Sequence, residues 1–282
     1  MTRGIAATLP PPPDPPELPE AARPRWPPWY APVALLTALG TILAAGLPIL
    51  PVILAAGVSE SLAAVSLLVL LIVQDGVLVG FALLFANFKR RPRPWHFGAR
   101  ATRFWPTAGW AALGFALLLG IEIGYIELFE VDETNVEDLG EGSPLAGLAI
   151  ALATIVVAPV AEEIFFRAFF YRALRSRLRV WSASLIDGLV FGALHFQGPD
   201  TAVILPVIAL VGVGLCLVYE RTGSLFAVIA IHAAFNTVAT LGIAPVAALL
   251  VGALLLLACV LVPKRLGPAP SPFGLNPRAV PA

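Results

Sequence analysis

Six polar side chains recur at helical spacing inside otherwise apolar stretches of this sequence. An ionisable group in hydrocarbon costs several kcal/mol, so each one inside a membrane span is a functional hypothesis by default. Carboxylate, imidazole and amide groups are also the usual parts of a hydrolytic site. The six residues form three motifs in chain order, Glu162-Glu163-x-x-x-Arg167, Phe191-x-x-x-His195 and His232-x-x-x-Asn236.

The first motif contains two carboxylates with different expected environments. Glu163 and Arg167 are four residues apart, so on a helix they share one face and can form an internal ion pair that lowers the cost of burial. Glu162 points about 100° away from its neighbour and keeps no local partner. Glu162 is therefore the carboxylate that is free for chemistry, although a structural role of both residues in helix packing is the alternative.

The other two motifs supply imidazole and amide groups at a similar depth. His232 and Asn236 stack on one helix face. Counting from the inner helix ends, Glu162 lies about 15 Å deep, and His195 about 20 Å. By the same rise His232 and Asn236 lie about 13 and 19 Å deep. We therefore expect the four groups to meet near the middle of the membrane, although a lone membrane histidine is often an interhelical hydrogen-bonder.

Such a group has the parts that hydrolyse an amide bond. The desolvated carboxylate of Glu162 can take a proton from water, while an imidazole aligns that water or protonates the leaving nitrogen. A second imidazole and an amide N–H can stabilise the tetrahedral oxyanion. Alternatively, a catalytic Zn²⁺ with a bound water could be held by one carboxylate and two imidazoles, namely Glu162, His195 and His232.

Composition indicates that lipid surrounds the elements carrying these groups. Hydrophobic residues make up 59% of the 282 and charged residues 13%, against roughly 45–50% and 25% in soluble domains. A soluble globular protein is thereby excluded, and we expect the lipid bilayer to surround most of the chain. The 18 basic and 18 acidic residues balance, so no basic field exists to attract nucleic acid. Cys216 and Cys259 lie in apolar runs, so we expect small buried side chains and no disulfide.

The apolar stretches predict an all-α membrane protein with a bundle of eight transmembrane helices. A spanning helix requires about 20 apolar residues, and eight segments approach that length. The fifth and seventh are short, and the fifth spans only if neighbouring helices cover its ends. The eight are Val33–Gly57, Ser61–Phe88, Pro106–Phe129, Leu145–Tyr171, Ser182–Phe196, Ala202–Tyr219, Leu225–Leu241 and Ala244–Val262.

Charge placement predicts the orientation. Cytoplasmic loops of membrane proteins are enriched in Lys and Arg, and with eight spans seventeen of the 18 basic residues fall on one side. The exception is Arg167, within a span, while the connection before the fourth span is acidic. We therefore expect a multi-pass protein of the plasma membrane with both termini in the cytoplasm.

Proline separates the membrane domain from two tails. Residues 1–32 hold eleven of the 27 prolines, and residues 263–282 hold six. Proline removes the backbone donors that helices and sheets need, so both segments are expected to be disordered, solvated tails. The domain prediction is thus a tail at 1–32, a transmembrane domain at 33–262 with its motif core at 145–240, and a tail at 263–282.

The three ordered motifs resemble those of the CPBP intramembrane proteases, also called Abi or CAAX-protease-like, which include the CAAX prenyl endopeptidases. Flanking residues also fit, namely Ala158-Pro159 before the first motif and Arg221-Thr-Gly-Ser-Leu225 before the last. The resemblance covers about residues 145–240. Ala168 departs from the family, which often has Gly after the Arg.

The resemblance implies a cytoplasm-facing cavity that cleaves peptides or protein C-terminal tails, with or without a lipid chain. It implies that Glu162 activates water with His195 and that His232 and Asn236 form the oxyanion site. Glu163 and Arg167 would position their helix. Members are often labelled metalloproteases, but these roles require no metal, so the favoured mechanism has no cofactor and Zn²⁺ is the alternative.

Two other interpretations use the same or nearby polar groups. Asp75 and Asp187 both lie in spans and could in principle pair as an aspartyl dyad, although Asp187 is two turns before His195 and better suits a supporting contact near the site. The second is a non-catalytic membrane protein, a transporter or a bacteriocin-immunity-type scaffold. That class does not require an amide four residues from an imidazole, so the protease remains the favoured prediction, with a general peptide as substrate.

Overall fold

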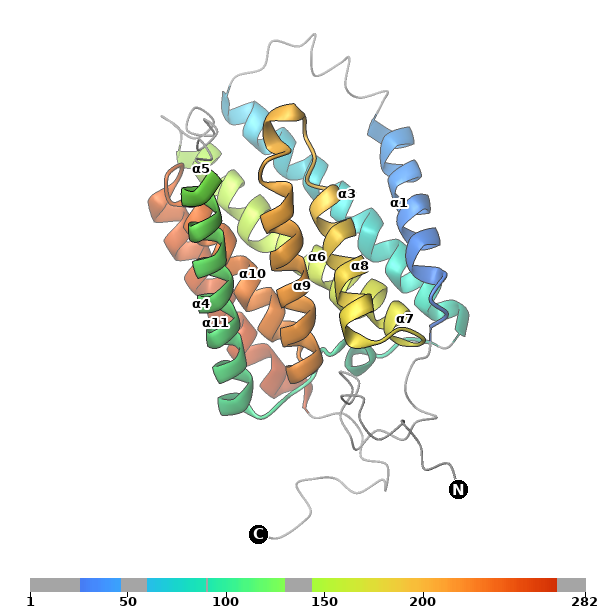
Figure 1. Ribbon diagram of the computed structural model, residues 1–282. Coiled ribbons are helices and arrows are strands. Elements are labelled where there is room, and N and C mark those ends of the chain that lie inside the picture. The colour runs from blue at the N-terminus through green and yellow to red at the C-terminus, as the bar shows by residue number, and fades with distance from the viewer. Residues whose placement is uncertain (1–25, 47–59, 90, 130–143, 268–282) are drawn as a thin grey trace, which may run out of the picture.

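The computed structural model of the protein describes residues 26–46, 60–89, 91–129 and 144–267. Within these ranges every regular element is helical, and the long helices run side by side as a bundle (Figure 1). The longer helices are α1 (Tyr30–Gly46), α3 (Glu60–Lys89), α4 (Phe104–Phe129), α8 (Val180–Ala193), α9 (Leu205–Thr222), α10 (Leu225–Thr240) and α11 (Pro245–Leu266).

The fourth hydrophobic segment is one continuous helical run from Pro144 to Arg175. It is divided by changes in helical pitch into α5 (Pro144–Ala151), η5 (Leu152–Val157), α6 (Ala158–Phe165), η6 (Phe166–Tyr171) and α7 (Arg172–Arg175). Two short 3₁₀ turns, η3 (Pro94–Phe97) and η7 (Pro199–Thr201), lie in the connections before α4 and before α9.

The helices correspond to the predicted spans, and the all-helical membrane fold is confirmed. Five described helices are long and apolar enough to cross a bilayer, whereas α1, α8 and α10 are shorter apolar helices of 10–17 residues. Because backbone groups cannot be left unsatisfied in lipid, such segments must be helical. The second half of the first predicted span, after Gly46, lies outside the described residues.

The boundaries at the two ends differ from the predicted ones. The helix α1 begins at Tyr30, and Trp26 before it is 1% exposed, packed on Phe97 and Phe169. At the other end α11 continues to Leu266. The start of α1 and the end of α11 lie at the same end of the bundle (Figure 1), as an even number of crossings requires. Most of the two Pro-rich segments lies outside the described residues.

Small residues allow α8 and α9 to approach closely. A Cβ on Gly188 would lie 2.6 Å from the Ala209 carbonyl oxygen, and one on Gly192 would lie 2.8 Å from Ala209 Cβ. A Cβ on Gly212 would lie 2.9 Å from Gly188 Cα. Helix pairs in membranes gain most of their association energy from such close backbone packing. This contact fixes the position of α8, which carries the second motif.

The turn between α9 and α10 sets the start of the helix that carries the third motif. Gly223 ends α9 in a left-handed conformation with φ 57°, which glycine adopts without a steric penalty. The Ser224 side chain then caps α10 by accepting a hydrogen bond from Ala227 N at 3.3 Å. The Leu225 amide donates to Gly98 O at 3.0 Å. The flanking sequence Arg221-Thr-Gly-Ser-Leu225 thus ends α9 at Gly223 and begins α10 at Ser224.

Candidate active site

A buried ion pair forms the base of the site. Arg167 Nη1 donates to Glu163 Oε1 at 2.9 Å, and both side chains are 0% exposed. This is the pair that the four-residue spacing predicts. In hydrocarbon neither charge could be left alone, because removing one partner of a buried pair leaves an uncompensated charge.

The same Glu163 oxygen also holds His232 of α10. His232 Nδ1 lies 2.9 Å from Glu163 Oε1, and the imidazole is the donor because a carboxylate only accepts. A hydrogen bond at one ring nitrogen fixes the tautomer and leaves Nε2 directed elsewhere. His232 is therefore oriented by a carboxylate on the neighbouring helix.

Glu162 lies on the other side of that imidazole. His232 Nε2 is 3.9 Å from Glu162 Oε2, too far for a direct hydrogen bond. Glu162 Oε2 is buried and has no hydrogen-bond partner among the described residues. A buried carboxylate oxygen without a partner is costly, and a polar gap of this length is one that a water can bridge.

Phe191 lies between the two histidines. Its ring centroid is 4.7 Å from that of His195 and 5.9 Å from that of His232. The Arg167 guanidinium carbon lies 4.3 Å from the same ring centroid, within the range of a cation–π contact. Phe191 thus explains the motif Phe191-x-x-x-His195, since one ring contacts both imidazoles and the buried arginine.

His195 lies just past the end of α8 and is half-buried. Its Nδ1 is 2.8 Å from the Phe191 carbonyl oxygen. That oxygen can only accept, so Nδ1 carries the proton and Nε2 is left for other partners. No hydrogen bond or ion pair joins His195 to Glu162 in the described ranges, whereas Glu162 faces His232.

Asn236 is held by a carbonyl that proline leaves free. Asn236 Nδ2 donates to Thr154 O at 2.7 Å, and Thr154 lies in η5, where the backbone follows a π-helical pattern. In that pattern the partner of Thr154 O is the amide five residues on, which is Pro159 and has no N–H. The π turn and Pro159 together therefore release one carbonyl for Asn236.

Asp187 supports Arg167 from α8, as its position two turns before His195 predicts. Asp187 Oδ1 is 3.8 Å from Arg167 Nε and accepts from Cys216 Sγ at 3.1 Å. Cys216 is buried and, like Cys259, forms no disulfide. Asp75, 2% exposed on α3, instead lies near enough to Glu162 for their charges to interact. Asp187 thus faces the arginine of the first motif.

The three ligands of the alternative zinc site do not converge. No group of three or more His, Cys, Asp or Glu side chains in the described part of the chain is placed so that it could hold a metal ion. In particular, Glu162, His195 and His232 do not form a tetrahedral ligand set. The residues present therefore do not fit a bound Zn²⁺ in this arrangement.

Several contacts at the site carry no clear sequence signal. Thr240 Oγ1 donates to Asn236 O at 2.6 Å and lies 3.3 Å from Thr154 Oγ1, so two threonines link α10 to η5. The bond between His232 and Glu163 was also not predicted. Hydropathy gives no information on how one helix is rotated against another, and that rotation decides which carboxylate meets the imidazole. The proline at 159 was the available signal for the Asn236 contact.

Comparison with known proteins gives one family match, over the segment that carries the three motifs. Residues 144–238 match the family model described as type II CAAX prenyl endopeptidase Rce1-like. This segment belongs to the CPBP intramembrane protease family. The match covers about a third of the 282 residues and includes all three motifs. No curated protein and no solved structure gives a significant match to the chain.

The CPBP assignment agrees with the arrangement of the helices. The matched segment begins at the start of α5 and ends within α10, so it contains the helices that carry the carboxylates, both imidazoles and the amide. The chain is thus a multi-pass membrane protein with an intramembrane endopeptidase domain. Its remaining helices, α1, α3, α4 and α11, lie outside the matched segment.

Proposed function

We propose that the protein is an intramembrane endopeptidase in which Glu162 activates a water molecule for attack on a peptide carbonyl. The observation that carries this proposal is the 3.9 Å gap between Glu162 Oε2 and His232 Nε2. The carboxylate oxygen on one side lacks a partner, and the ring nitrogen on the other is the free one. A water between them would be polarised by two proton acceptors.

The other residues take complementary roles in this proposal. Glu163 holds His232 at Nδ1, which fixes the orientation of the imidazole ring. Once protonated at Nε2, His232 can donate to the tetrahedral oxyanion, and Asn236 retains a second amide N–H for the same purpose. His195 uses Nδ1 for the Phe191 carbonyl, so its Nε2 serves water alignment with Glu162 or protonation of the leaving nitrogen.

The proposed mechanism uses no metal ion, since Glu162, the two histidines and Asn236 would themselves supply the base, the proton donors and the oxyanion site. The test is activity of the purified protein after dialysis against a tight chelator such as 1,10-phenanthroline. We expect cleavage to persist at an unchanged rate. Loss of cleavage that is restored by added Zn²⁺ alone would establish a metalloprotease instead.

The description of the matched family indicates which peptide substrates to compare first. The family is described by the cleavage of prenylated CAAX C-termini, so a prenylated C-terminal peptide and its unprenylated counterpart are the first pair to compare. We propose a general peptide substrate, for which the prenyl chain changes KM by less than about tenfold. A strict requirement for the prenyl chain would contradict this part of the proposal.

The decisive experiment uses a quenched fluorescent peptide and the protein in detergent. Glu162→Gln, His195→Ala and His232→Ala should each abolish cleavage while leaving the helical circular dichroism unchanged. Truncating a member of a catalytic constellation commonly costs a factor of about 10³–10⁴ or more. Arg177→Gln, an exposed change away from the three motifs, is the matched control. Full activity of Glu162→Gln would refute the mechanism, and inactivity of the wild type on every peptide would favour a transporter or immunity-type scaffold.

A further inference from the structure

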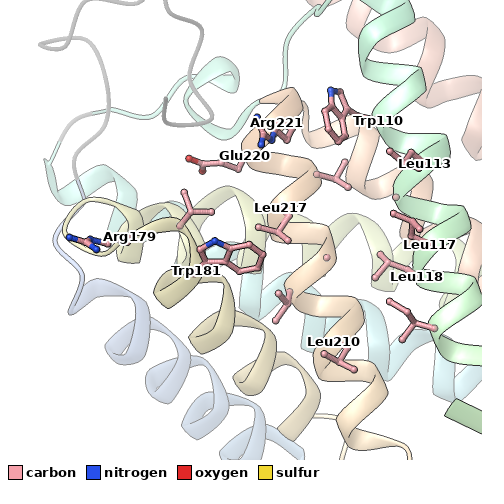
Figure 2. Close-up of a pocket in the computed structure, with 16 residues that line it drawn as sticks. Trp110, Leu113, Leu117, Leu118, Arg179, Trp181, Leu210, Leu217, Glu220 and Arg221 are labelled. Atoms are coloured by element: carbon pink, nitrogen blue, oxygen red, sulfur yellow. The ribbon is translucent and has the colours of Figure 1, made fainter. Parts of the chain in front are cut away.

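A large apolar groove lies outside the site, between α4, α9 and the start of α8. It has a volume of about 700 Å³ (Figure 2), a size that accommodates a drug-sized or lipid-chain-sized ligand. None of the residues of the three motifs lines it. Its lining combines aromatic, aliphatic and basic side chains, among them Trp110, Leu117, Arg179, Trp181, Leu217 and Arg221.

The groove is polarised along its length. Arg221 and Trp110 lie at one end, and Leu210 lies at the other (Figure 2). From Leu210 to Arg221 the helix rises about 16 Å, roughly half the thickness of a hydrocarbon core. The groove therefore matches the depth of one leaflet, with its charged end at the membrane surface.

Arg221 at that end and Arg179 on the opposite side of the groove are both free to attract an anionic ligand (Figure 2). Both are exposed, and in the described part of the chain neither takes part in an ion pair. The acidic neighbour Glu220 is already bound to Arg175 at 2.6 Å and to the Tyr171 hydroxyl at 2.9 Å. Its negative charge is thus compensated from inside the bundle, which leaves a positive rim above an apolar channel.

Aromatic side chains complete the arrangement. The Arg221 guanidinium carbon lies 5.5 Å from the centroid of the Trp110 ring, and Trp181 is 64% exposed. Tryptophan is enriched at the level of lipid headgroups. Close packing forms the floor of the groove, since a Cβ on Gly114 would lie 2.6 Å from Val218 Cγ2 and one on Gly214 would lie 2.4 Å from Leu118.

We propose that this groove is a binding site for an anionic phospholipid. One acyl chain lies along the apolar channel, the phosphate of the headgroup binds Arg221 beside Trp110, and Arg179 adds positive charge from the opposite side of the groove. Basic pockets between transmembrane helices bind anionic headgroups in this way. The positive rim favours an anionic lipid over a neutral one. Because no motif residue lines the groove, the groove is distinct from the place where the peptide substrate would bind.

The test measures lipid retention by native mass spectrometry of the full-length protein purified from mixed micelles. The micelles contain equal amounts of dioleoyl phosphatidylglycerol and dioleoyl phosphatidylcholine. Each arginine at a membrane surface contributes a factor on the order of five in affinity for an anionic lipid. We expect the wild type to retain phosphatidylglycerol over phosphatidylcholine by about tenfold or more. Arg179→Gln with Arg221→Gln should remove this preference.

A second variant tests the channel itself. Leu217→Trp fills the groove and should abolish retention of both lipids. Two matched controls leave the groove intact: Leu254→Trp on an exposed face of α11, and Arg177→Gln with Arg265→Gln, which removes the same charge from exposed positions elsewhere. Both controls should retain phosphatidylglycerol like the wild type.

Three outcomes would overturn the proposal. Equal retention of the two lipids by the wild type would show that the arginines do not bind the phosphate of the headgroup. Retention unchanged by Leu217→Trp would place the lipid elsewhere. Displacement of phosphatidylglycerol by a prenylated peptide, but not by its unprenylated counterpart, would show that the groove belongs to the substrate chain.

Discussion

At the residue scale, two adjacent carboxylates of the same chemical type have opposite roles. Glu163 neutralises Arg167 and holds His232 through its Oε1 at 2.9 Å, whereas Glu162 approaches His232 only to 3.9 Å and its buried Oε2 has no hydrogen-bond partner among the described residues. The first therefore stabilises the fold, and the second is kept at an energetic cost. Stability and activity should separate when the same substitution is made at each position.

We expect Glu163→Gln to lower the free energy of unfolding by about 3 kcal/mol, because it leaves the Arg167 charge uncompensated inside the bundle. Glu162→Gln should leave that free energy unchanged within about 0.5 kcal/mol or raise it. Reversible unfolding in mixed micelles, followed by circular dichroism, measures both values. Equal destabilisation by the two substitutions would contradict the division of roles.

At the element scale, a change of helical pitch positions the side chain of Asn236. The π turn η5 and Pro159 release Thr154 O, and Asn236 takes it. Pro159→Ala should restore a backbone donor that competes for this carbonyl. Because a misplacement of about 1 Å can cost as much as 10²-fold, we expect kcat to fall tenfold or more, with KM nearly unchanged.

The control for that substitution is Pro206→Ala in the first turn of α9, where a proline removes no helical hydrogen bond. Activity equal to the wild type is expected there. Wild-type kcat in Pro159→Ala would show that Asn236 does not depend on the released carbonyl.

The contact between α8 and α9 makes a second prediction at this scale. Gly188→Leu would force a side chain against the backbone of α9, and overpacking of this kind costs about 1–3 kcal/mol or more. Gly124→Leu on α4 meets nothing within 4 Å and should be neutral. Thermal unfolding in detergent compares the two, and an unchanged midpoint for Gly188→Leu would mean that the helices are less closely packed.

The sequence predicted the helices and the ion pair because both depend on local periodicity. Hydropathy locates a span, since lipid permits only a helix there, and a four-residue spacing puts Glu163 and Arg167 on one face. The sequence did not predict that His232 binds Glu163 or that Asn236 binds Thr154. Those contacts depend on the rotation and depth of α10 against the fourth span, which only the packed bundle determines.

At the scale of the whole molecule, orientation in the membrane remains to be tested. The helix α7 and the end of α9 lie at the end of the bundle where α1 begins and α11 ends (Figure 1), and they carry Arg172, Arg175 and Arg221. The positive-inside rule predicts that this end faces the cytoplasm. In a Cys216→Ala, Cys259→Ala background, Arg177→Cys should react with a membrane-impermeant maleimide only after the cells are opened, whereas Val203→Cys should react in intact cells. The reverse pattern would invert the topology.

The packing of Trp26 has a practical consequence for deletion and fusion at the N-terminus. Its indole ring contacts Phe169 of η6, on the helix that also carries Glu162, and the Arg172 guanidinium lies 5.8 Å from its centroid. Deletion of residues 1–25 leaves this anchor in place. Deletion of Trp26 as well should remove the indole and expose its aromatic neighbours on the helix that carries Glu162, so N-terminal truncations and tags should keep this residue.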